Sequence, residues 1–376
     1  MSLAANWFRD NFPGEVLYAV KANPSLWALD AIYAAGLRWF DVASEAEIEL
    51  IASRYKDATL AFMHPVKSRK AIERAYFKYG VRIFALDCEE ELDKIVEATK
   101  GAQDLTLVVR LAVSNSEAGY ALSGKFGVHR ERAPMLLQRA RQHANELGVS
   151  FHVGSQCMNP SAYRDAMELA SSVILEAAVT LDIVDVGGGF PSAYPGMTPP
   201  DLSLYLSVIR EVFEDMPVVM NADLWCEPGR ALVAESTSIL ARVELAKDGA
   251  LYLNDGSYGN LFDAAHCKWP FPVKAHRADG VFEGEDVGFK LYGPTCDSLD
   301  AMDGPFVLPS DIREGDYIEI GMLGAYGVAM QTRFNGYGET ETMKVEDAPW
   351  TSMYGEIIPP ASNVVRFPRK RRVRAR

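Results

Sequence analysis

Charged and polar side chains recur directly after short apolar runs of the sequence, and several of them could act on an organic substrate. They are Lys21, Asp41, His64, Asp87, Arg110, His152, Ser155, Glu227 and Arg230. Lys21 follows the apolar run 16–20, and burial at the end of a strand disfavours the ammonium form of lysine. A neutral lysine amine can form a Schiff base with an aldehyde. We therefore expect Lys21 to be a reactive amine rather than a solvated surface lysine.

Three consecutive glycines follow another apolar run, in the segment Asp-Val-Gly-Gly-Gly-Phe-Pro at 185–191. Because glycine lacks a Cβ, the backbone N–H groups of Gly187, Gly188 and Gly189 can approach an anion closely. The spacing fits neither the dinucleotide-binding GxGxxG pattern nor the P-loop pattern. Alone, the glycines could form a structural bend, but together with Arg230 they predict a phosphate-binding cup.

Eight short apolar runs must position these side chains. The runs are 16–20, 39–42, 60–63, 82–86, 105–110, 150–153, 183–186 and 222–226. Their nearly continuous hydrophobicity is typical of parallel strands that are covered on both faces. Eight strand-then-helix units over about 220 residues predict an α/β fold, a (β/α)8 TIM-type barrel, within residues 1–234. The polar side chains then share the carboxyl-terminal rim, where barrel enzymes build their sites.

Helix signals support this alternation. The segment 23–25 begins an apolar-periodic stretch that stops at Gly36, and Ser44 with Glu47 predicts a capping box. A long helical pattern covers 130–147.

The pattern changes after residue 234. Strand-like segments at 236–244, 251–254, 287–292 and 316–320 are divided by Gly, Pro and Asp, which predicts a second, β-rich domain over 235–365. Residues 366–376 hold seven cationic side chains and are expected to form a solvated, disordered tail.

Composition excludes several classes of function. The chain has 376 residues, and 38 Lys and Arg against 51 Asp and Glu give a formal net charge of −13. This balance argues against nucleic acid as a partner, and no run of about 18 apolar residues predicts a membrane span. The five cysteines lack CxxC spacing, so we expect reduced thiols in a cytoplasmic protein and no metal site.

Eight motifs that occur in order between residues 18 and 336 carry a resemblance to a known family. They are Tyr-Ala-Val-Lys-Ala-Asn-Pro (18–24), His-Val-Gly-Ser-Gln (152–156), Asp-Val-Gly-Gly-Gly-Phe-Pro (185–191), Cys-Glu-Pro-Gly-Arg (226–230), Asn-Asp-Gly-Ser-Tyr-Gly (254–259), Gly-Pro-Thr-Cys-Asp (293–297), Gly-Ala-Tyr-Gly (324–327) and Phe-Asn-Gly (334–336). Together they resemble the fold-type III basic amino-acid decarboxylases, which depend on pyridoxal phosphate and share an alanine racemase-like barrel. Within this family, the chain resembles ornithine and lysine/ornithine decarboxylases in particular.

The resemblance implies roles for the residues at the rim. Lys21 would hold pyridoxal phosphate covalently, His152 would stack on its ring, and Glu227 would pair with the ring nitrogen. A carboxylate there keeps the ring protonated, so that the ring accepts the electrons left when CO2 departs. The other cofactor-binding positions implied are Asp41, Arg110, Ser155, Gly187, Gly188, Gly189, Gly229, Arg230 and Tyr326. Glu47 matches a position near the lysine, although its capping role is an equal alternative.

The resemblance also implies a homodimer with shared active sites. Cys296 and Asp297 would enter the site of the partner subunit, where the Cys296 thiol would protonate the substrate carbon and Asp297 would bind the distal ammonium. Tyr258, Asp263 and Phe334 are further substrate-binding candidates. The implied reaction is the decarboxylation of ornithine or lysine to putrescine or cadaverine, a step of polyamine biosynthesis.

Other functions stay open at this stage. Diaminopimelate decarboxylases usually carry Cys-Glu where this chain has Cys296-Asp297, and arginine is another possible substrate of the family. An amino-acid racemase of this fold would place arginine opposite the ring nitrogen, which Glu227 opposes. A single-domain carrier of the cofactor would lack Cys296 and the second domain. A catalytically inactive, protein-binding homologue is the non-enzymatic alternative.

Only about 15 residues precede the first predicted strand. We therefore expect the chain to lack a strand and part of a helix that family members have, with 7–12 as the helix's remnant. Loss of that strand would leave an unpaired sheet edge in the second domain.

Overall fold

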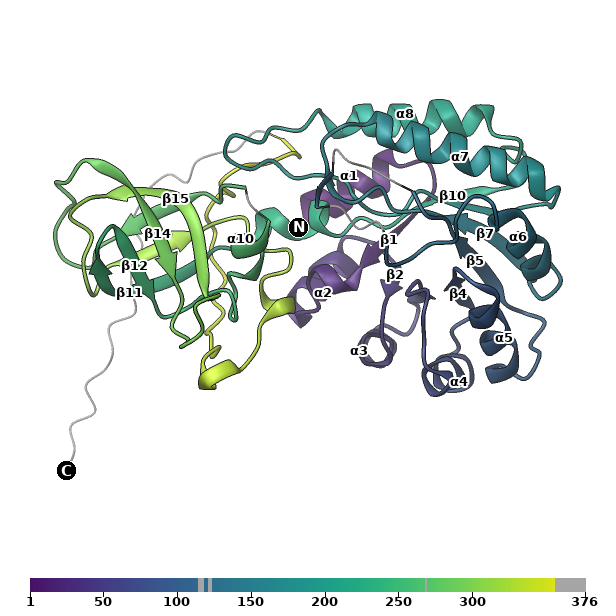
Figure 1. Cartoon of the computed structure of the whole chain (residues 1–376), viewed down its shortest axis with the longest axis horizontal. Helices are drawn as coiled ribbons and strands as arrows, with labels where there is room; N and C mark the ends of the chain where they lie inside the picture. Colours follow the sequence, from purple (N-terminus) through teal and green to yellow (C-terminus); the bar gives the residue numbers. More distant parts are fainter. Residues whose placement is uncertain (114–117, 121–123, 268, 356–376) are drawn as a thin grey trace.

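The computed structural model describes residues 1–113, 118–120, 124–267 and 269–355, and its first part is a closed barrel of parallel strands (Figure 1). Around the barrel the strand order is β1-β2-β3-β4-β5-β7-β9-β10, and β10 pairs with β1 to close it. The strands are β1 (Glu15–Ala19), β2 (Trp39–Val42), β3 (Thr59–Phe62), β4 (Ile83–Leu86), β5 (Thr106–Arg110), β7 (Glu146–Ser150), β9 (Ile183–Asp185) and β10 (Asp223–Cys226). The predicted (β/α)8 barrel is confirmed.

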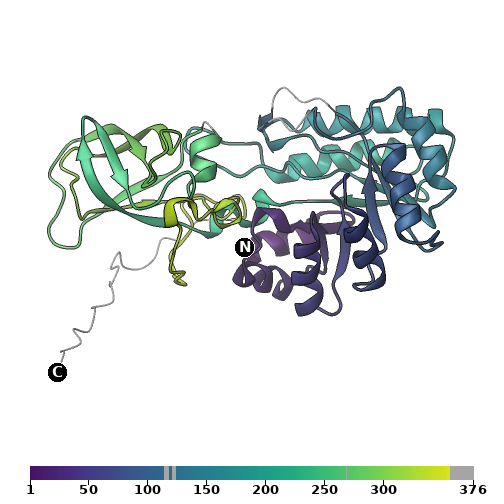
Figure 2. The same cartoon turned by 60° about the horizontal axis from the view of Figure 1, so that its bottom comes forward.

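Helices surround the barrel wall (Figures 1 and 2). They are α1 (Ser2–Asn11), α2 (Leu26–Ala34), α3 (Glu45–Arg54), α4 (Arg69–Phe77), α5 (Glu89–Ala98), α6 (Ala133–Arg141), α7 (Ser161–Ala177), α8 (Leu202–Asp215) and α9 (Arg230–Val233), with 3-10 turns η1 (Val20–Ala22) and η2 (Ala234–Ser236). A two-stranded ribbon, β6 (Ala118–Tyr120) with β8 (Ser155–Cys157), lies outside the barrel wall.

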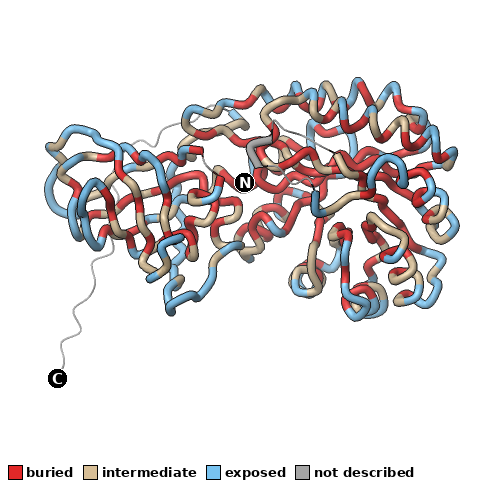
Figure 3. The backbone as a smooth tube through the Cα atoms, in the orientation of Figure 1, coloured by how far each residue is buried: buried red, intermediate tan, exposed pale blue. Residues whose placement is uncertain are grey.

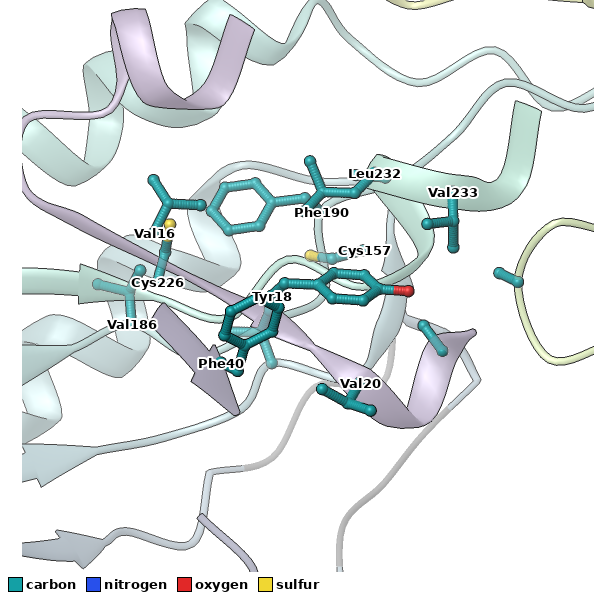
Figure 4. Packing of buried hydrophobic residues seen from close by; sticks show 14 of the residues in the cluster. Val16, Tyr18, Val20, Phe40, Cys157, Val186, Phe190, Cys226, Leu232 and Val233 are labelled. Carbon is teal, nitrogen blue, oxygen red and sulfur yellow. The ribbon is translucent and has the colours of Figure 1, made fainter. Parts of the chain in front are cut away.

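Strand side chains alternate between two buried layers, as a pleated strand requires. Leu17 and Trp225 belong to the core inside the barrel, together with Val108 and Ile183. Val16 and Tyr18 on β1 belong to the larger core outside it. Figure 4 shows this outer layer, with Val16, Tyr18 and Val20 beside Phe40 and Phe190, and Figure 3 shows buried residues concentrated along the barrel wall. This two-sided burial explains why the strands are almost continuously apolar.

The predicted capping box at the start of α3 forms with one change of partner. The Ser44 hydroxyl accepts the Glu47 N–H at 3.2 Å. The Glu47 carboxylate accepts the Ala43 N–H at 2.6 Å, one residue before the helix cap. Glu47 therefore has a structural task at the head of the helix.

The sixth barrel strand differs from the prediction. It was expected at 150–153, after a helix over 130–147, but β7 ends at Ser150 and α6 ends at Arg141. The cause is the ladder with β5, in which residues 146–150 pair with residues 106–110. Pairing along a whole strand outweighs the helix preference of the segment before it. Gly148 also allows close approach, since a Cβ there would lie 2.9 Å from the Ile183 Cβ.

The second part of the chain is a six-stranded sheet in the order β13-β16-β11-β12-β14-β15. Its elements are β11 (Ile239–Lys247), β12 (Ala250–Leu253), α10 (Phe262–His266), β13 (Val273–His276), β14 (Asp286–Tyr292), β15 (Ala301–Pro309), β16 (Tyr317–Ile320), η3 (Val328–Met330) and η4 (Phe334–Gly336). The β-rich second domain is confirmed, and four of its strands overlap the predicted segments. The sequence prediction missed β13 and β15. Asp303, Gly304 and Pro305 interrupt β15 with residues typical of turns, while its pairing with β14 holds it in the sheet.

Figures 1 and 2 show the sheet beside the barrel along the long axis of the molecule, with the N-terminus near their junction. The predicted basic tail, 366–376, lies outside the described residues. Within the described part of the chain, every helix is too short or too polar to span a bilayer.

Candidate active site

The carboxyl ends of the barrel strands bring the candidate residues to one rim. Lys21 lies in η1 directly after β1, and Asp41 lies near the end of β2. Asp185 ends β9, and Glu227 follows β10. Because β10 pairs with both β1 and β9, these side chains come from neighbouring strands.

Lys21 forms an ion pair with Asp41, with 2.6 Å between Nζ and Oδ2. The Asp41 carboxylate is buried, whereas 41% of the Lys21 side chain is exposed at the rim. Desolvation lowers the pKa of Lys21, but the nearby Asp41 and Glu227 carboxylates outweigh it and raise the pKa above its ordinary value. The expectation that burial alone would leave a neutral amine is therefore wrong. Lys21 is held as an ammonium, and Asp41 is placed to receive its proton.

Glu227 and Asp185 form a buried pair of carboxyl groups. Asp185 is completely buried, its Oδ1 accepts the Gly187 N–H at 2.8 Å, and its Oδ2 receives no donor from a described residue. Burial raises the pKa of Asp185 to about 6, although hydrogen bonding with the Gly187 N–H and the Glu227 side chain lowers it. Burial and the Asp185 charge also raise the pKa of Glu227 well above its ordinary value. Burial therefore favours the protonated form of both carboxyl groups.

This pair predicts a pH-dependent effect of Asp185→Asn on stability. A carboxyl whose pKa rises on folding costs stability once the pH exceeds its unfolded pKa, here across the window from 3.8 to about 6. Asparagine keeps the acceptor for Gly187 and adds an N–H donor toward Glu227. We expect the variant to be more stable than the wild type by about 1–3 kcal/mol at pH 8, with the difference vanishing below about pH 4.

Urea unfolding of the cofactor-free protein at several pH values measures this difference. Asp215→Asn, an exposed carboxylate at the end of α8, is the matched control and is expected to leave the pH profile unchanged. A variant that is equally or less stable than the wild type at pH 8 would show that Asp185 is not held against ionisation.

The three glycines after β9 are required by close packing. A Cβ on Gly187 would lie 2.0 Å from the Phe151 carbonyl oxygen, and one on Gly189 would lie 2.6 Å from the Gly154 carbonyl oxygen. Both residues also have positive φ angles, +66° and +109°. The loop therefore lies directly against the segment that follows β7, and only glycine fits at these positions.

His152, in the segment after β7, has a fixed ring orientation. Its Nδ1 accepts the Gly154 N–H at 3.0 Å, so the neutral ring carries its proton on Nε2. Desolvation lowers the pKa of His152 well below its ordinary value, and the charges of Arg110 and Lys21 lower it further. A neutral, oriented imidazole at the rim suits stacking on a planar ligand.

Arg230 begins α9 and is buried beside the glycine loop. Its Nε donates to the Ser155 hydroxyl at 3.3 Å, and its Cζ lies 5.2 Å from the centre of the Tyr326 ring. The Tyr326 N–H donates to the Ala22 carbonyl at 2.9 Å, which seats the 324–327 loop next to Lys21. Gly229 lets the 226–230 segment approach η1, since a Cβ there would lie 3.1 Å from the Ala22 Cβ. The residues predicted to form a phosphate cup thus come from three separate segments.

Four candidate residues gather in the second domain instead. Tyr258 donates its hydroxyl proton to the Asp297 Oδ2 at 2.5 Å, and its ring lies 5.0 Å from that of Phe334. Cys296 is exposed, and both its N–H (3.2 Å) and its thiol (3.3 Å) reach the Asn335 Oδ1. Among the described residues, no hydrogen bond or ion pair joins this group to the residues at the barrel rim.

Asp263 is separated from these four residues. It lies on α10 and forms an ion pair with Arg230, the arginine of the expected phosphate cup. Arg110 ends β5 and lies with its Cζ 5.6 Å from the centre of the Phe126 ring.

The structure adds residues that sequence patterns did not single out. Gln156 bridges two loops, with its Oε1 accepting the Ser192 N–H at 3.0 Å. Asp300 is buried and accepts hydrogen bonds from Ser257 and Thr295, which holds the 293–297 loop beside the Tyr258 loop. Gln156 lies inside the 152–156 motif, and Asp300 lies shortly after the 293–297 motif. A polar residue inside or next to a motif is therefore the sequence signal that could have identified them.

Comparisons with known proteins agree with this architecture. The pyridoxal-binding domain of pyridoxal-dependent decarboxylases matches residues 2–234, and the C-terminal sheet domain of the same family matches residues 151–324. An ornithine decarboxylase of Caenorhabditis elegans is 32% identical over 375 residues, covering 92% of this chain and 85% of that protein. Antizyme inhibitor 2 of Xenopus laevis is 30% identical over 357 residues, covering 86% and 74%.

Solved structures give the same result. The lysine/ornithine decarboxylase of Vibrio vulnificus, complexed with putrescine, superposes with a TM-score of 0.77 at 28% identity, and the match covers 92% of each chain. The two matched family domains together cover residues 2–324 of this chain. The chain therefore belongs to the family of pyridoxal-dependent decarboxylases.

Proposed function

We propose that this protein decarboxylates a basic L-amino acid, ornithine or lysine, to the corresponding diamine with the help of pyridoxal phosphate. The observation that supports the proposal most is the proximity of Lys21 and Glu227 at one rim, where the Glu227 charge affects the Lys21 amine. An amine for an aldehyde and a carboxylate for a ring nitrogen are the two groups that this cofactor requires of a decarboxylase.

The residues at the rim fit pyridoxal phosphate. The Arg230 guanidinium, the Ser155 hydroxyl and the backbone N–H groups of Gly188 and Gly189 would provide donors for a phosphate group. The unsatisfied Oδ2 of the buried Asp185 indicates that a further polar partner suits this place. His152 would lie against the ring, and Lys21 would hold the aldehyde carbon.

Each residue then has a task in the reaction. Bound pyridoxal phosphate supplies an electron-withdrawing ring that accepts the electron pair released when CO2 leaves. Asp41 takes the Lys21 ammonium proton, which frees the amine to react. Glu227 would pair with the ring nitrogen, and burial with the Asp185 charge raises the pKa of Glu227 well above its ordinary value. His152, neutral and fixed, contributes no competing charge beneath the ring.

We further propose that the active unit is a homodimer. Cys296 is exposed and Asp297 only half-buried in a single chain, and the exposed Leu299 follows them. A second copy that covers this loop would bring the Cys296 thiol and the Asp297 carboxylate to the barrel rim of its partner.

Release of CO2 from L-ornithine, L-lysine, L-arginine and diaminopimelate, measured side by side on the same preparation with pyridoxal phosphate, tests the proposed function. We expect turnover of ornithine or lysine to exceed that of the other two. The two preferred substrates differ by one methylene, so their kcat/KM values should differ by no more than about 200-fold. Preference for diaminopimelate or arginine would overturn the substrate assignment, and no CO2 from any of them would overturn the activity.

Asp297→Ala is expected to raise KM for the preferred diamino acid by about tenfold or more, since a charge-assisted contact to the distal ammonium is lost. Hydrogen bonds from the Leu299 N–H and the Tyr258 hydroxyl lower the pKa of Asp297, so the carboxylate stays charged at neutral pH. Tyr258→Phe, which removes only the hydroxyl, is the milder comparison. An unchanged KM in steady-state assays would remove the ammonium-binding role.

A second candidate function is that of a binding protein without activity, because one relative is named as an inhibitor protein rather than an enzyme. Absorption near 400–430 nm, roughly as expected of lysine-bound pyridoxal phosphate, separates the two. A colourless protein that does not bind the cofactor would favour the binding protein.

A further inference from the structure

Arg230 and Asp263 form a buried ion pair inside the expected phosphate cup. The Arg230 Nη1 lies 2.6 Å from Asp263 Oδ2, and Nη2 lies 3.2 Å from Oδ1, a bidentate arrangement. The two side chains are only 4% and 6% exposed. Arg230 comes from α9 and Asp263 from α10, so a short helix after the barrel delivers a carboxylate to the arginine.

The remaining donors of Arg230 are also largely engaged. Nη1 donates to the Tyr194 hydroxyl at 2.8 Å, and Nε donates to the Ser155 hydroxyl at 3.3 Å. A guanidinium has five N–H donors, and these four hydrogen bonds leave one of them at Nη2. The Cys267 thiol donates to the Asp263 Oδ1 at 2.9 Å, which fixes the carboxylate further. An anion at the cup therefore meets an arginine that is already occupied.

The pair also cancels the charge of the cup. Arg230 contributes one positive charge and Asp263 one negative charge, and both lie where water does not screen them. The Lys21 ammonium, at the same rim, is paired with Asp41. A phosphate group that approaches Arg230 is attracted by the guanidinium and repelled by the carboxylate beside it.

We propose that Asp263 competes with the phosphate group of the cofactor for Arg230 and thereby lowers the affinity of this protein for pyridoxal phosphate. The inference rests on the proposed function and assigns Asp263 to the cofactor side of the site. The substrate ammonium is then left to Asp297, which lies with Tyr258 and Phe334. Asp263 acts through Arg230 and is a positioning residue in this scheme.

Asp263→Asn tests the proposal with a variant of nearly the same shape. Asparagine removes the charge and holds Arg230 more weakly, so the guanidinium is available to phosphate. We expect the dissociation constants of the cofactor-free variant for inorganic phosphate and for pyridoxal phosphate to fall about tenfold relative to the wild type. Calorimetric titration measures both constants without any assay of activity. Asp248→Asn, which removes an exposed carboxylate from the second domain, is the matched control and should leave both constants unchanged.

A second pair of variants separates repulsion by Asp263 from its effect on folding. Arg230→Gln leaves the Asp263 carboxylate without its partner, so we expect phosphate binding to be lost almost completely. The double variant Arg230→Gln/Asp263→Asn removes both charges and should bind phosphate more tightly than Arg230→Gln alone. Removing both members of a buried ion pair is far less disruptive than removing one, so the double variant is expected to fold even if Asp263→Asn does not.

Two results would overturn the proposal. Asp263→Asn that binds phosphate equally or more weakly than the wild type would show that Asp263 supports Arg230 rather than competing with it. The same conclusion follows if the double variant binds no better than Arg230→Gln. A failure of the proposed function would look different. Pyridoxal phosphate would then show no absorption that depends on Lys21, while the affinities of the variants for inorganic phosphate would still rank as expected.

Discussion

Lys21→Ala is expected to abolish covalent attachment of pyridoxal phosphate and to reduce kcat by about 10⁴-fold or more. Lys21 is the lysine at the barrel rim that lies directly after a strand and faces the Asp41 and Glu227 carboxylates. Alanine cannot react with an aldehyde, and it leaves the buried Asp41 without its partner. Absorption of the dialysed protein near the visible edge measures attachment, and CO2 release measures turnover.

Lys21→Arg separates the loss of chemistry from the loss of the ion pair. Arginine keeps a positive charge for Asp41 but does not lose its proton in proteins, so it cannot act as a nucleophilic amine. We expect this variant to fold with near-native stability and to be as inactive as Lys21→Ala. Lys247→Ala, at the end of β11 in the sheet, should keep full activity. Retention of turnover or of the absorption band in Lys21→Arg would assign the cofactor to another lysine.

Cys296→Ala is expected to slow turnover by about 10²–10³-fold while cofactor binding survives, because loss of a proton donor in the transition state has an effect of this size. The thiol is exposed and hydrogen-bonded to Asn335, so alanine leaves no buried donor unsatisfied. Without this donor, part of the substrate would be diverted to an aldehyde, with water supplying the aldehyde oxygen and the amine group remaining on the cofactor. Chromatography of the products detects this diversion, and Cys88→Ala, which removes the thiol at the N-cap of α5, is the control.

Mixing the two inactive variants tests the shared site in the same system. In a dimer with shared sites, a Lys21→Ala chain paired with a Cys296→Ala chain has one site that contains both native residues. Random exchange of subunits should therefore restore about a quarter of the native activity. No recovery after verified subunit exchange would place Lys21 and Cys296 of one chain in the same site.

The local sequence was sufficient to predict the barrel and most of its rim. Apolar runs that precede Lys21, Asp41, Arg110 and Glu227 mark strands whose carboxyl ends must meet, whatever the details of packing. The glycine loop was equally visible, because close backbone approach admits no other residue there. These features depend on a few neighbouring residues and on the alternation of strands and helices.

Some elements of the fold depended on pairing with distant segments. The bounds of β7 follow from its ladder with β5, which overrode the helix pattern before it. β13 and β15 are held by β16 and β14, although their own composition gave weak strand signals. A hydrogen-bonded neighbour strand can stabilise a segment that local preference alone would leave irregular.

The sequence by itself therefore determined which side chains reach the rim, and the tertiary structure decided what each of them meets there. The raised pKa of Lys21, the raised pKa values of Asp185 and Glu227, and the partner of Asp263 all depend on groups that the fold brings together from different segments of the chain. Electrostatic interactions in a buried site change steeply with distance and desolvation, and the amino-acid sequence gives neither quantity directly.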